Sequence, residues 1–320
     1  MYPLQDTDFM PLRLIAEPAF YWLTGEPLSS SIIGEERGGT EMERLLSSCF
    51  VAILVIAMAL TLCLRNPVRL RGSDLFRSYQ RLVINLETYS WPSIEDRHFI
   101  VKYKQGDEAS ARMVLQEAER VYQPLGAYFG YFPGKSVPIL IYPDRVSLNR
   151  IFGWGSDESA MGVYWAGVIR VLSPLAWMDD PPVNQQQQIF QAQGPVAHEY
   201  VHLLVDYKTG GNYPRWLTEG LAQYAEETVT GGEPPDRERI AVTGVTIKQL
   251  DSRFDDPVWQ DYSYAVAKDL VSSLIDRYGP ERMRDLLDAL GGGQPMDKAF
   301  AKTYGINLDE FIRSYNGSQC

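Results

Sequence analysis

The stretch AHEYVHLLVDYKTGGNYPRWLTEGLAQYAEE, residues 197–227, decides how this sequence folds and what it can bind. It holds two of the three histidines of a 320-residue chain, His198 and His202, with Glu199 between them and Glu219 further along. Apolar residues recur at helical spacing on both sides of a Gly-Gly pair, and glycine commonly ends a helix. The pattern therefore predicts two helices joined by a short loop.

The two histidines are spaced to share a metal ion. Residues four apart lie on one face of a helix, so both imidazole rings can turn a nitrogen to one point. Zinc accepts such nitrogens at about 2.0–2.1 Å, and a catalytic zinc site keeps one position open for water. Glu199 is rotated by about 100° from His198 around the helix, which places it beside the metal, where it can take a proton from water. This arrangement is the HExxH pattern of zinc-dependent hydrolysis.

A third protein ligand is predicted in the second helix. If the two helices run antiparallel, Glu219 of the segment WLTEGLA returns to the histidines. The alternative is an amphipathic helix whose five-residue HExxH match is accidental, but the second motif at a workable distance argues against it. If Glu219 does not bind the metal, Glu226 and Glu227 are the next candidates.

Composition excludes several classes of function. The net charge of −11 and the absence of a basic stripe argue against a nucleic-acid partner, which needs concentrated Lys and Arg. Cys49 and Cys63 lie in an apolar run and Cys320 is the last residue. The sequence between them therefore offers no disulfide framework and no catalytic cysteine.

Residues 45–64 are 20 uncharged and mostly apolar residues, the length of a transmembrane helix. We expect a single span there, after an N-terminal tail over residues 1–44 whose native start the sequence leaves open. Counting the arginines that follow the span would put the C-terminal side in the cytoplasm. An export-like start at Met42 favours the opposite orientation, with the C-terminal part outside the cytoplasm.

The rest of the chain divides into a juxtamembrane connector, residues 65–97, and one folded domain, residues 98–316. We predict an α+β fold, in which a mixed sheet with a packed helix precedes a helical subdomain that begins near Gln185. The segments that predict the first part are a strand in HFIVKY from His98, a helix over Asp107–Tyr122, a strand over residues 137–143, and a hairpin or bent strand over residues 162–174.

HEYVH followed by WLTEGLAQY resembles the gluzincin metallopeptidases, and most closely the bacterial peptidase MA-like proteins, which are often membrane-anchored. The resemblance extends over about residues 98–316 and implies a thermolysin-like catalytic domain, with the metal between the sheet and the helices. The 16 residues between the second histidine and the later glutamate are slightly fewer than in the best-known gluzincins. The resemblance implies, position by position, that His198, His202 and Glu219 are ligands of Zn²⁺ and that Glu199 is the general base.

The sequence departs from this family at one supporting position. Several gluzincins place a carboxylate one turn after the glutamate ligand, where it holds the second ring nitrogen of a histidine. Gln223 stands there, and an amide can accept that hydrogen bond but lends the ring less basicity. Asp206, one turn beyond His202, is an alternative holder, and it can equally be read as a solvated helix residue.

An oxyanion donor is also expected opposite the metal, because zinc alone only half stabilises the negative oxygen formed on a carbonyl. Tyr264 falls where related peptidase MA-like sequences carry a tyrosine, counting back from Tyr278-Gly279. Tyr262 is the runner-up. Both rings can instead simply pack against the core.

These observations predict a membrane-anchored zinc metallopeptidase that hydrolyses peptide bonds. A peptide or protein substrate could align in extended form along the strand edge of GVYWAGVIRV, residues 162–171. The alternative is a membrane-tethered binding protein that keeps the fold without catalysis. His98 and Trp216 are expected to be structural, and the oligomeric state is left open.

Overall fold

The computed structural model describes residues 72–155, 160–179, 181–231 and 246–317. The predicted tail and the predicted span, residues 45–64, lie outside the described residues, as does the start of the connector. Within the described ranges, no helix combines the length and the apolar character that crossing a membrane requires.

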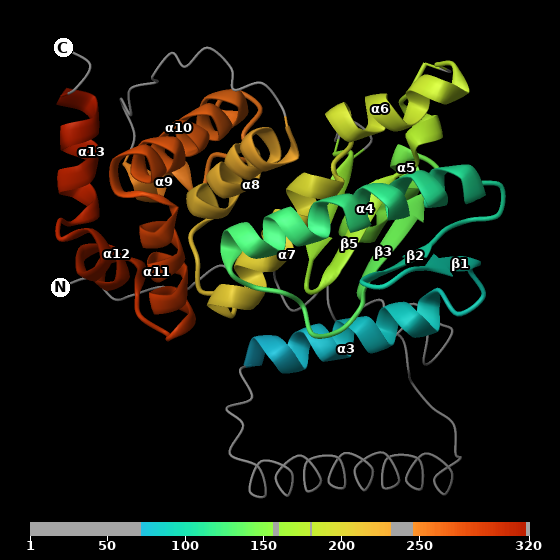
Figure 1. The fold of residues 1–320 in the computed structure, drawn as a ribbon, viewed down its shortest axis with the longest axis horizontal. Coiled ribbons are helices and arrows are strands. Elements are labelled where there is room, and N and C mark those ends of the chain that lie inside the picture. The colour runs from blue at the N-terminus through green and yellow to red at the C-terminus, as the bar shows by residue number, and fades with distance from the viewer. Residues whose placement is uncertain (1–71, 156–159, 180, 232–245, 318–320) are drawn as a thin grey trace, which may run out of the picture. The chain divides into compact units, whose positions relative to one another are not determined.

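Strands and helices alternate in the first half of the described chain, and the second half is helical (Figure 1). This is the α+β arrangement that the sequence predicts. The elements in chain order are α3 (Gly72–Glu87), β1 (Ser93–Glu95), β2 (Phe99–Lys102), α4 (Glu108–Phe129), β3 (Val137–Tyr142), α5 (Arg145–Phe152), β4 (Gly162–Trp165), β5 (Val168–Leu172), a 3₁₀ turn η1 (Pro174–Ala176), α6 (Val183–Gln193), α7 (Val196–Thr209), α8 (Arg215–Thr230), α9 (Ile247–Leu250), α10 (Gln260–Tyr278), α11 (Pro280–Gly291), α12 (Met296–Tyr304) and α13 (Leu308–Gly317).

The sheet has five strands in the order β1-β2-β3-β5-β4. The central pairs, β2 with β3 and β3 with β5, are parallel, whereas β1 and β4 pair antiparallel with their neighbours. The sheet is therefore mixed, as predicted, and β4 forms one edge of it. That edge lies next to α7, the helix that carries the HExxH residues (Figure 1).

The two faces of the sheet are covered by different helices. Alternate residues of β3 and β5, such as Ile139 and Ile169, join the large core that contains α4 and α7. The residues between them, such as Leu140 and Leu172, join a smaller core with Ile84 of α3. Because side chains alternate across a strand, one short run of apolar residues serves both layers.

The helix α4 is longer than the sequence predicts. Apolar spacing indicated Asp107–Tyr122, but the helix continues through Pro124 to Phe129 and ends at Gly130, which has a φ of 63°. Proline removes one backbone hydrogen bond and usually breaks a helix. Here the residues beyond it, Leu125 and Phe129, are buried in the large core, and their burial keeps the last two turns in place.

A tight hairpin joins β4 and β5, which is one of the two forms predicted for residues 162–174. Ala166 and Gly167 both have positive φ, 48° and 86°, which is the signature of a two-residue turn matched to strand twist. A Cβ on Gly167 would also lie 2.8 Å from the Tyr207 hydroxyl of α7. The turn is therefore fixed both by its own backbone and by the neighbouring helix.

In the helical half, α7 and α8 form the predicted pair, and α10 packs against α8. The crossing is close, because a Cβ on Gly220 would lie 2.3 Å from the carbonyl oxygen of Ala267. Two helix starts follow common sequence rules. Pro280 is the first residue of α11, and the Asn307 side chain accepts the Glu310 N–H at the start of α13.

Candidate metal centre

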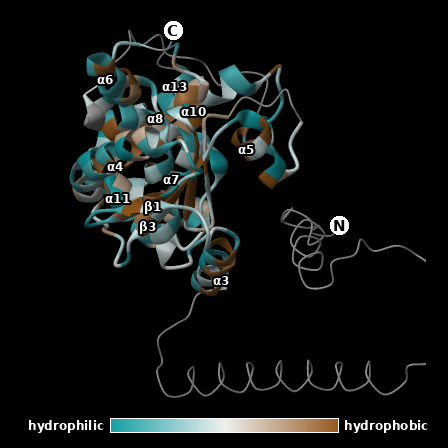
Figure 2. Cartoon of the chain, turned by 90° about the vertical axis from the view of Figure 1, so that its right-hand side faces the viewer, coloured by the Kyte–Doolittle hydropathy of each residue, from teal (hydrophilic) through white to brown (hydrophobic). Residues whose placement is uncertain are grey.

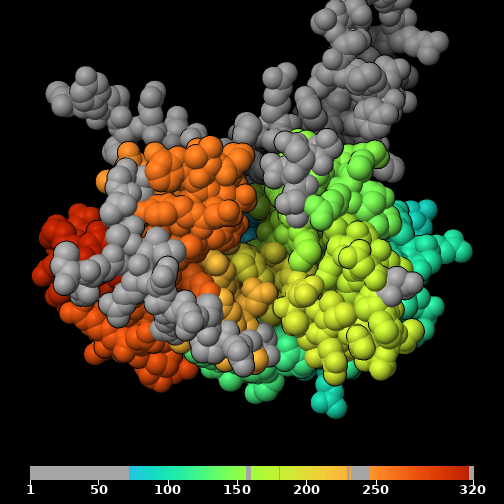
Figure 3. Space-filling model, turned by 90° about the horizontal axis from the view of Figure 1, so that it is seen from above, coloured from blue at the N-terminus to red at the C-terminus, as the bar shows by residue number. Residues whose placement is uncertain are grey.

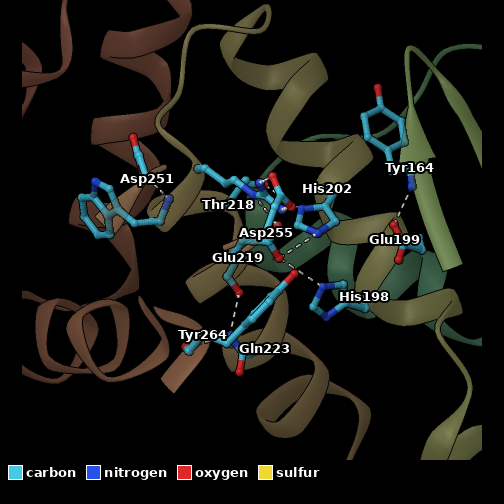
Figure 4. A network of polar contacts seen from close by, with 12 residues as sticks. Tyr164, His198, Glu199, His202, Thr218, Glu219, Gln223, Asp251, Asp255 and Tyr264 are labelled. Carbon is cyan, nitrogen blue, oxygen red and sulfur yellow. Dashed lines mark hydrogen bonds and ion pairs between the residues drawn. The ribbon is translucent and has the colours of Figure 1, made fainter. Parts of the chain in front are cut away.

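The helices α7 and α8 bring the three predicted ligands together. The first helix ends at Gly210, whose φ of 69° is left-handed, and the second begins directly after Pro214. The short loop between them turns the chain back, so that ligand atoms of His198, His202 and Glu219 all lie within 4.8 Å of one another. Sequence spacing predicted this meeting, and Figure 4 shows it.

The two oxygens of Glu219 have different surroundings. Oε2 lies 3.5 Å from His198 Nε2 and 3.4 Å from His202 Nε2, yet it is buried and receives no hydrogen bond. Oε1 faces Arg215, whose Nε is 3.6 Å away. Burial acts to raise the pKa of the Glu219 carboxyl, but His202 and His198 outweigh it and hold that pKa well below its usual value.

Arg215 is a residue of this site that the sequence reasoning missed. It is the first residue of α8, one turn before Glu219, and its guanidinium is bound by both carboxylate oxygens of Asp255, at 2.6 and 2.8 Å. A bidentate pair fixes the guanidinium plane. Arg215 is therefore held where its charge orients Glu219. The i, i+4 spacing of Arg215 and Glu219 in the sequence could have predicted this contact.

The second ring nitrogens of both histidines are occupied, but not by the residues expected. His202 Nδ1 lies 2.7 Å from Thr218 Oγ1, and His198 Nδ1 lies 3.2 Å from Glu226 Oε2. Gln223 instead donates to the Tyr264 carbonyl at 3.0 Å, so the prediction that it holds a histidine is wrong. Gln223, one turn after Glu219, therefore faces α10, whereas Glu226, about one turn later, contacts His198.

Asp206 was the other expected holder, and it too has a different role. Its carboxylate is buried, so Asp206 is not a solvated residue on the outside of the helix either. It accepts hydrogen bonds from Arg77 of α3 and from the Tyr164 hydroxyl. Asp206 therefore joins α7 to α3 and β4 and contacts neither histidine ring.

Glu199 lies beside the ligands, toward the sheet (Figure 4). Its Oε2 accepts the backbone N–H of Tyr164 in β4 at 2.6 Å, and the residue is 6% exposed. Burial raises the pKa of the Glu199 carboxyl, and His202 and His198 offset only part of that shift. A carboxylate with a raised pKa accepts a proton more readily near neutral pH.

Tyr264 lies on the opposite side from Tyr164. Figure 4 shows its ring beside Glu219 and His198, and the ring also packs edge-on against Phe254 at 5.1 Å. Burial raises the pKa of Tyr264 to about 12, with Glu219 acting in the same direction. The phenol therefore keeps its proton at neutral pH and can donate it. Tyr262 packs edge-on against Trp259 instead.

The donor set fits zinc. Two imidazoles and one carboxylate are a common catalytic set, and here both Nδ1 atoms have partners, which leaves both Nε2 atoms for a metal. A buried carboxylate oxygen without a hydrogen bond is costly unless something binds it. A cation between Oε2 and the two Nε2 atoms would satisfy all three.

The remaining predicted residues lie away from this point. His98 pairs with Glu119 at 2.6 Å and stacks on Tyr122, so its structural assignment is confirmed. Trp216 is 1% exposed and anchors the start of α8, as expected. Glu227 pairs with Lys268 of α10 and does not join the ligands.

The surface is hollowed above the ligand helices. Seen from above, the orange side that contains α10 and the yellow-green side that contains α6 stand apart, with gold side chains of the α7–α8 region between them (Figure 3).

Thr218→Val should lower zinc affinity by about 10- to 100-fold, the usual effect of removing the partner of a ligating histidine. Valine keeps the shape of threonine but leaves the Nδ1–H of His202 without an acceptor. Zinc competition with a chromogenic chelator measures the effect. The matched control is Thr228→Val on the same helix, where the hydroxyl bonds only the helix backbone and is exposed. Equal affinities in the two variants would show that Thr218 does not support the ligand.

Comparison with known families gives a match over the helical half. Residues 185–317 match the profile of the Peptidase MA superfamily. Among solved structures, the chain is similar to a mutant of an M1 zinc metallopeptidase from Deinococcus radiodurans, at 14% sequence identity and a TM-score of 0.39. That alignment covers 70% of this chain and 50% of the other, so this chain spans about half the length of that protein. The comparison with curated proteins gave no match.

Proposed function

We propose that this chain, whose residues 185–317 form a domain of the Peptidase MA superfamily, is a zinc-dependent peptidase that hydrolyses peptide bonds. The observation that carries the proposal is the buried Glu219 oxygen, which lies between two histidine Nε2 atoms without a hydrogen bond. A base held beside that point, Glu199, supplies the second requirement for hydrolysis.

Each residue around this point has a distinct task. His198, His202 and Glu219 would hold zinc, which polarises a carbonyl and makes water more acidic when it is bound. Glu199 takes the proton of the attacking water and later gives it to the leaving amine. Tyr264 donates a hydrogen bond from its hydroxyl to the oxygen that becomes negative. Glu199 and Tyr264 lie on opposite sides of the ligands (Figure 4), so a scissile bond held at the metal would have the base on one side and the hydrogen-bond donor on the other.

The edge strand β4 is the proposed alignment surface for an extended peptide. It pairs only with β5 within the sheet, and its other edge faces the site through Tyr164, whose N–H reaches Glu199. Gly162 lets β4 pack closely against the start of α7. A Cβ there would lie 2.6 Å from Pro195 and 2.9 Å from a Glu199 oxygen. Backbone hydrogen bonds along such an edge give affinity that is largely independent of substrate sequence.

We propose in addition that the enzyme is anchored in the membrane by residues 45–64, with the catalytic part outside the cytoplasm. The exposed face of α3 supports a position near lipid, because it carries Leu75, Leu82 and Leu86, each more than half exposed. These leucines recur at helical spacing and suit the surface of a bilayer. Figure 2 shows apolar residues on this helix.

A protease-accessibility experiment tests the orientation. Protease added to intact cells should digest the catalytic part of the chain, and lysis should change little. Protection in intact cells with digestion after lysis would favour the arginine count over the proposed orientation. Recovery of the full chain in the soluble fraction of lysed cells would contradict the anchor itself.

The proposed activity is tested with the purified full-length chain and a peptide library, with and without a chelator. We expect cleavage that the chelator abolishes and added zinc restores, together with one zinc per chain by elemental analysis. Zinc content of one with peptide binding but no cleavage would instead identify a binding protein that keeps the fold without catalysis. Absence of zinc binding would overturn the metal centre.

A further inference from the structure

The helix α3 reaches the far end of the zinc-binding helix through a buried ion pair. Arg77 is 7% exposed, and its guanidinium donates to Asp206 Oδ2 at 2.7 Å and to Asp74 of its own helix at 2.6 Å. The same guanidinium lies over the Tyr207 ring, 4.6 Å from its centre. Arg81, one turn later, donates to the Tyr207 hydroxyl at 2.7 Å. Two arginines of α3 thus hold the last turn of α7.

Asp206 carries this contact on to the edge strand. The oxygen that accepts from Arg77 also accepts the Tyr164 hydroxyl at 2.5 Å. Tyr164 in turn accepts the Gly167 N–H at 3.0 Å, which closes the β4–β5 turn around its ring. The side chain of Tyr164 is therefore fixed at one end of β4 by Arg77, Asp206 and the hairpin backbone.

The backbone of the same tyrosine holds the proposed base. Its N–H donates to Glu199 Oε2 at 2.6 Å, and this is the contact that turns the carboxylate toward the sheet. A continuous set of contacts, which we name the Arg77–Asp206–Tyr164 network, therefore leads from α3 to Glu199. None of its three side chains is a ligand, and Arg77 lies outside residues 185–317.

We propose that Arg77 is a positioning residue for hydrolysis, which acts through Asp206 and Tyr164 to set both the base and the strand edge that binds substrate. The expected changes in turnover and KM rest on the proposed peptidase function, whereas the expected change in the structure of β4 does not. Without the guanidinium, the Asp206 carboxylate is buried with only the phenol as partner, and a buried charge that loses its partner is strongly unfavourable. Relaxation of Asp206 releases Tyr164, and with it the N–H that orients Glu199.

Arg77→Met tests the proposal, because methionine keeps the length of the side chain and removes its charge. The full-length chain in detergent should retain its zinc, while amide exchange in peptides covering β4 becomes faster. Turnover should fall by roughly 3- to 30-fold, with a rise in KM because the substrate edge moves with the base. Arg77→Lys keeps the charge, so it should restore most of the slow amide exchange in β4 and most of the turnover. The amide exchange needs no activity, so it tests the network even if the wild-type chain hydrolyses nothing.

The matched control is Arg120→Met. Arg120 pairs with Glu117, whose side chain is 2% exposed, so this change also leaves a buried carboxylate short of a partner, but within α4. Faster exchange in β4 for Arg77→Met alone supports the proposal. Equal effects in the two variants would mean general destabilisation, and unchanged β4 exchange in Arg77→Met would show that the network does not hold the strand; either result overturns it.

A second variant covers the case in which Arg77→Met does not fold. Tyr164→Phe keeps the ion pair between Arg77 and Asp206 and removes only the hydroxyl that joins it to β4. It should also speed exchange in β4 and lower turnover without loss of zinc. Wild-type exchange and turnover in Tyr164→Phe would overturn the proposal.

Discussion

Glu199→Gln should abolish most turnover while the protein stays folded and loaded with zinc. Loss of a general base typically costs about 10²–10⁴-fold. The glutamine oxygen can still accept the Tyr164 N–H that holds Glu199, so the side chain keeps its place. An amide cannot take a proton from water at neutral pH. Because Glu199 is not among the three clustered ligands, zinc content should match that of the wild type.

The control for this variant is Glu219→Ala, which removes a ligand instead of the base. It should lower zinc affinity, with activity partly recovered at high zinc concentration. Elemental analysis and steady-state rates on both variants separate the two roles. Loss of metal in Glu199→Gln would make Glu199 a ligand. Full zinc occupancy of Glu219→Ala in dilute zinc would move the third ligand elsewhere, with Glu226 the next candidate because it already contacts His198.

Tyr264→Phe should reduce turnover by roughly 10²–10³-fold, the usual loss for one oxyanion donor. The pKa of Tyr264 is raised to about 12, so its hydroxyl is protonated at neutral pH and can donate a hydrogen bond. Phenylalanine removes only this hydroxyl. The ring should keep its packing against Phe254 and the fold should be unchanged. Zinc content and KM should stay close to wild type, because the negative oxygen exists only in the transition state.

Tyr262→Phe is the neighbouring control. Tyr262 packs against Trp259, and we expect its hydroxyl to be dispensable for turnover. A loss in Tyr262→Phe with a normal rate in Tyr264→Phe would transfer the role to the neighbour. Normal rates in both variants would mean that these rings serve only the core.

The ligand cluster could be predicted from the sequence because it depends on local geometry. Spacing of four on a helix fixes two histidines relative to each other, and a short loop after Gly210 returns the next helix antiparallel. The resemblance to peptidase MA-like sequences pointed to the same residues, and the superfamily match over residues 185–317 confirms that resemblance. For residues 162–174 the sequence left a hairpin and a bent strand open, and the positive φ of Ala166 and Gly167 identifies the hairpin.

The partners of the ligands could not be predicted, because they depend on how helices rotate against each other. Gln223 and Glu226 both lie on α8, and only the packing of that helix on α10 decides which of them faces His198. The sequence places Asp206 one turn beyond His202, whereas its partners come from α3 and β4. The length of α4 beyond Pro124 likewise depends on core burial and not on local propensity.

The separation in sequence between contacting residues at this site has a consequence for the order of folding. The hydrogen bonds that support the histidines join residues 16 and 28 positions apart, the bond that holds Glu199 spans 35, and the Arg77–Asp206 pair spans 129. Closing a longer loop costs more entropy, so near contacts tend to form before distant ones. On refolding from denaturant, we expect the helical hairpin that carries the three candidate ligands to close first, and the proposed base to be aligned only when α3 docks. The chain would then assemble its candidate metal ligands before it positions the proposed base.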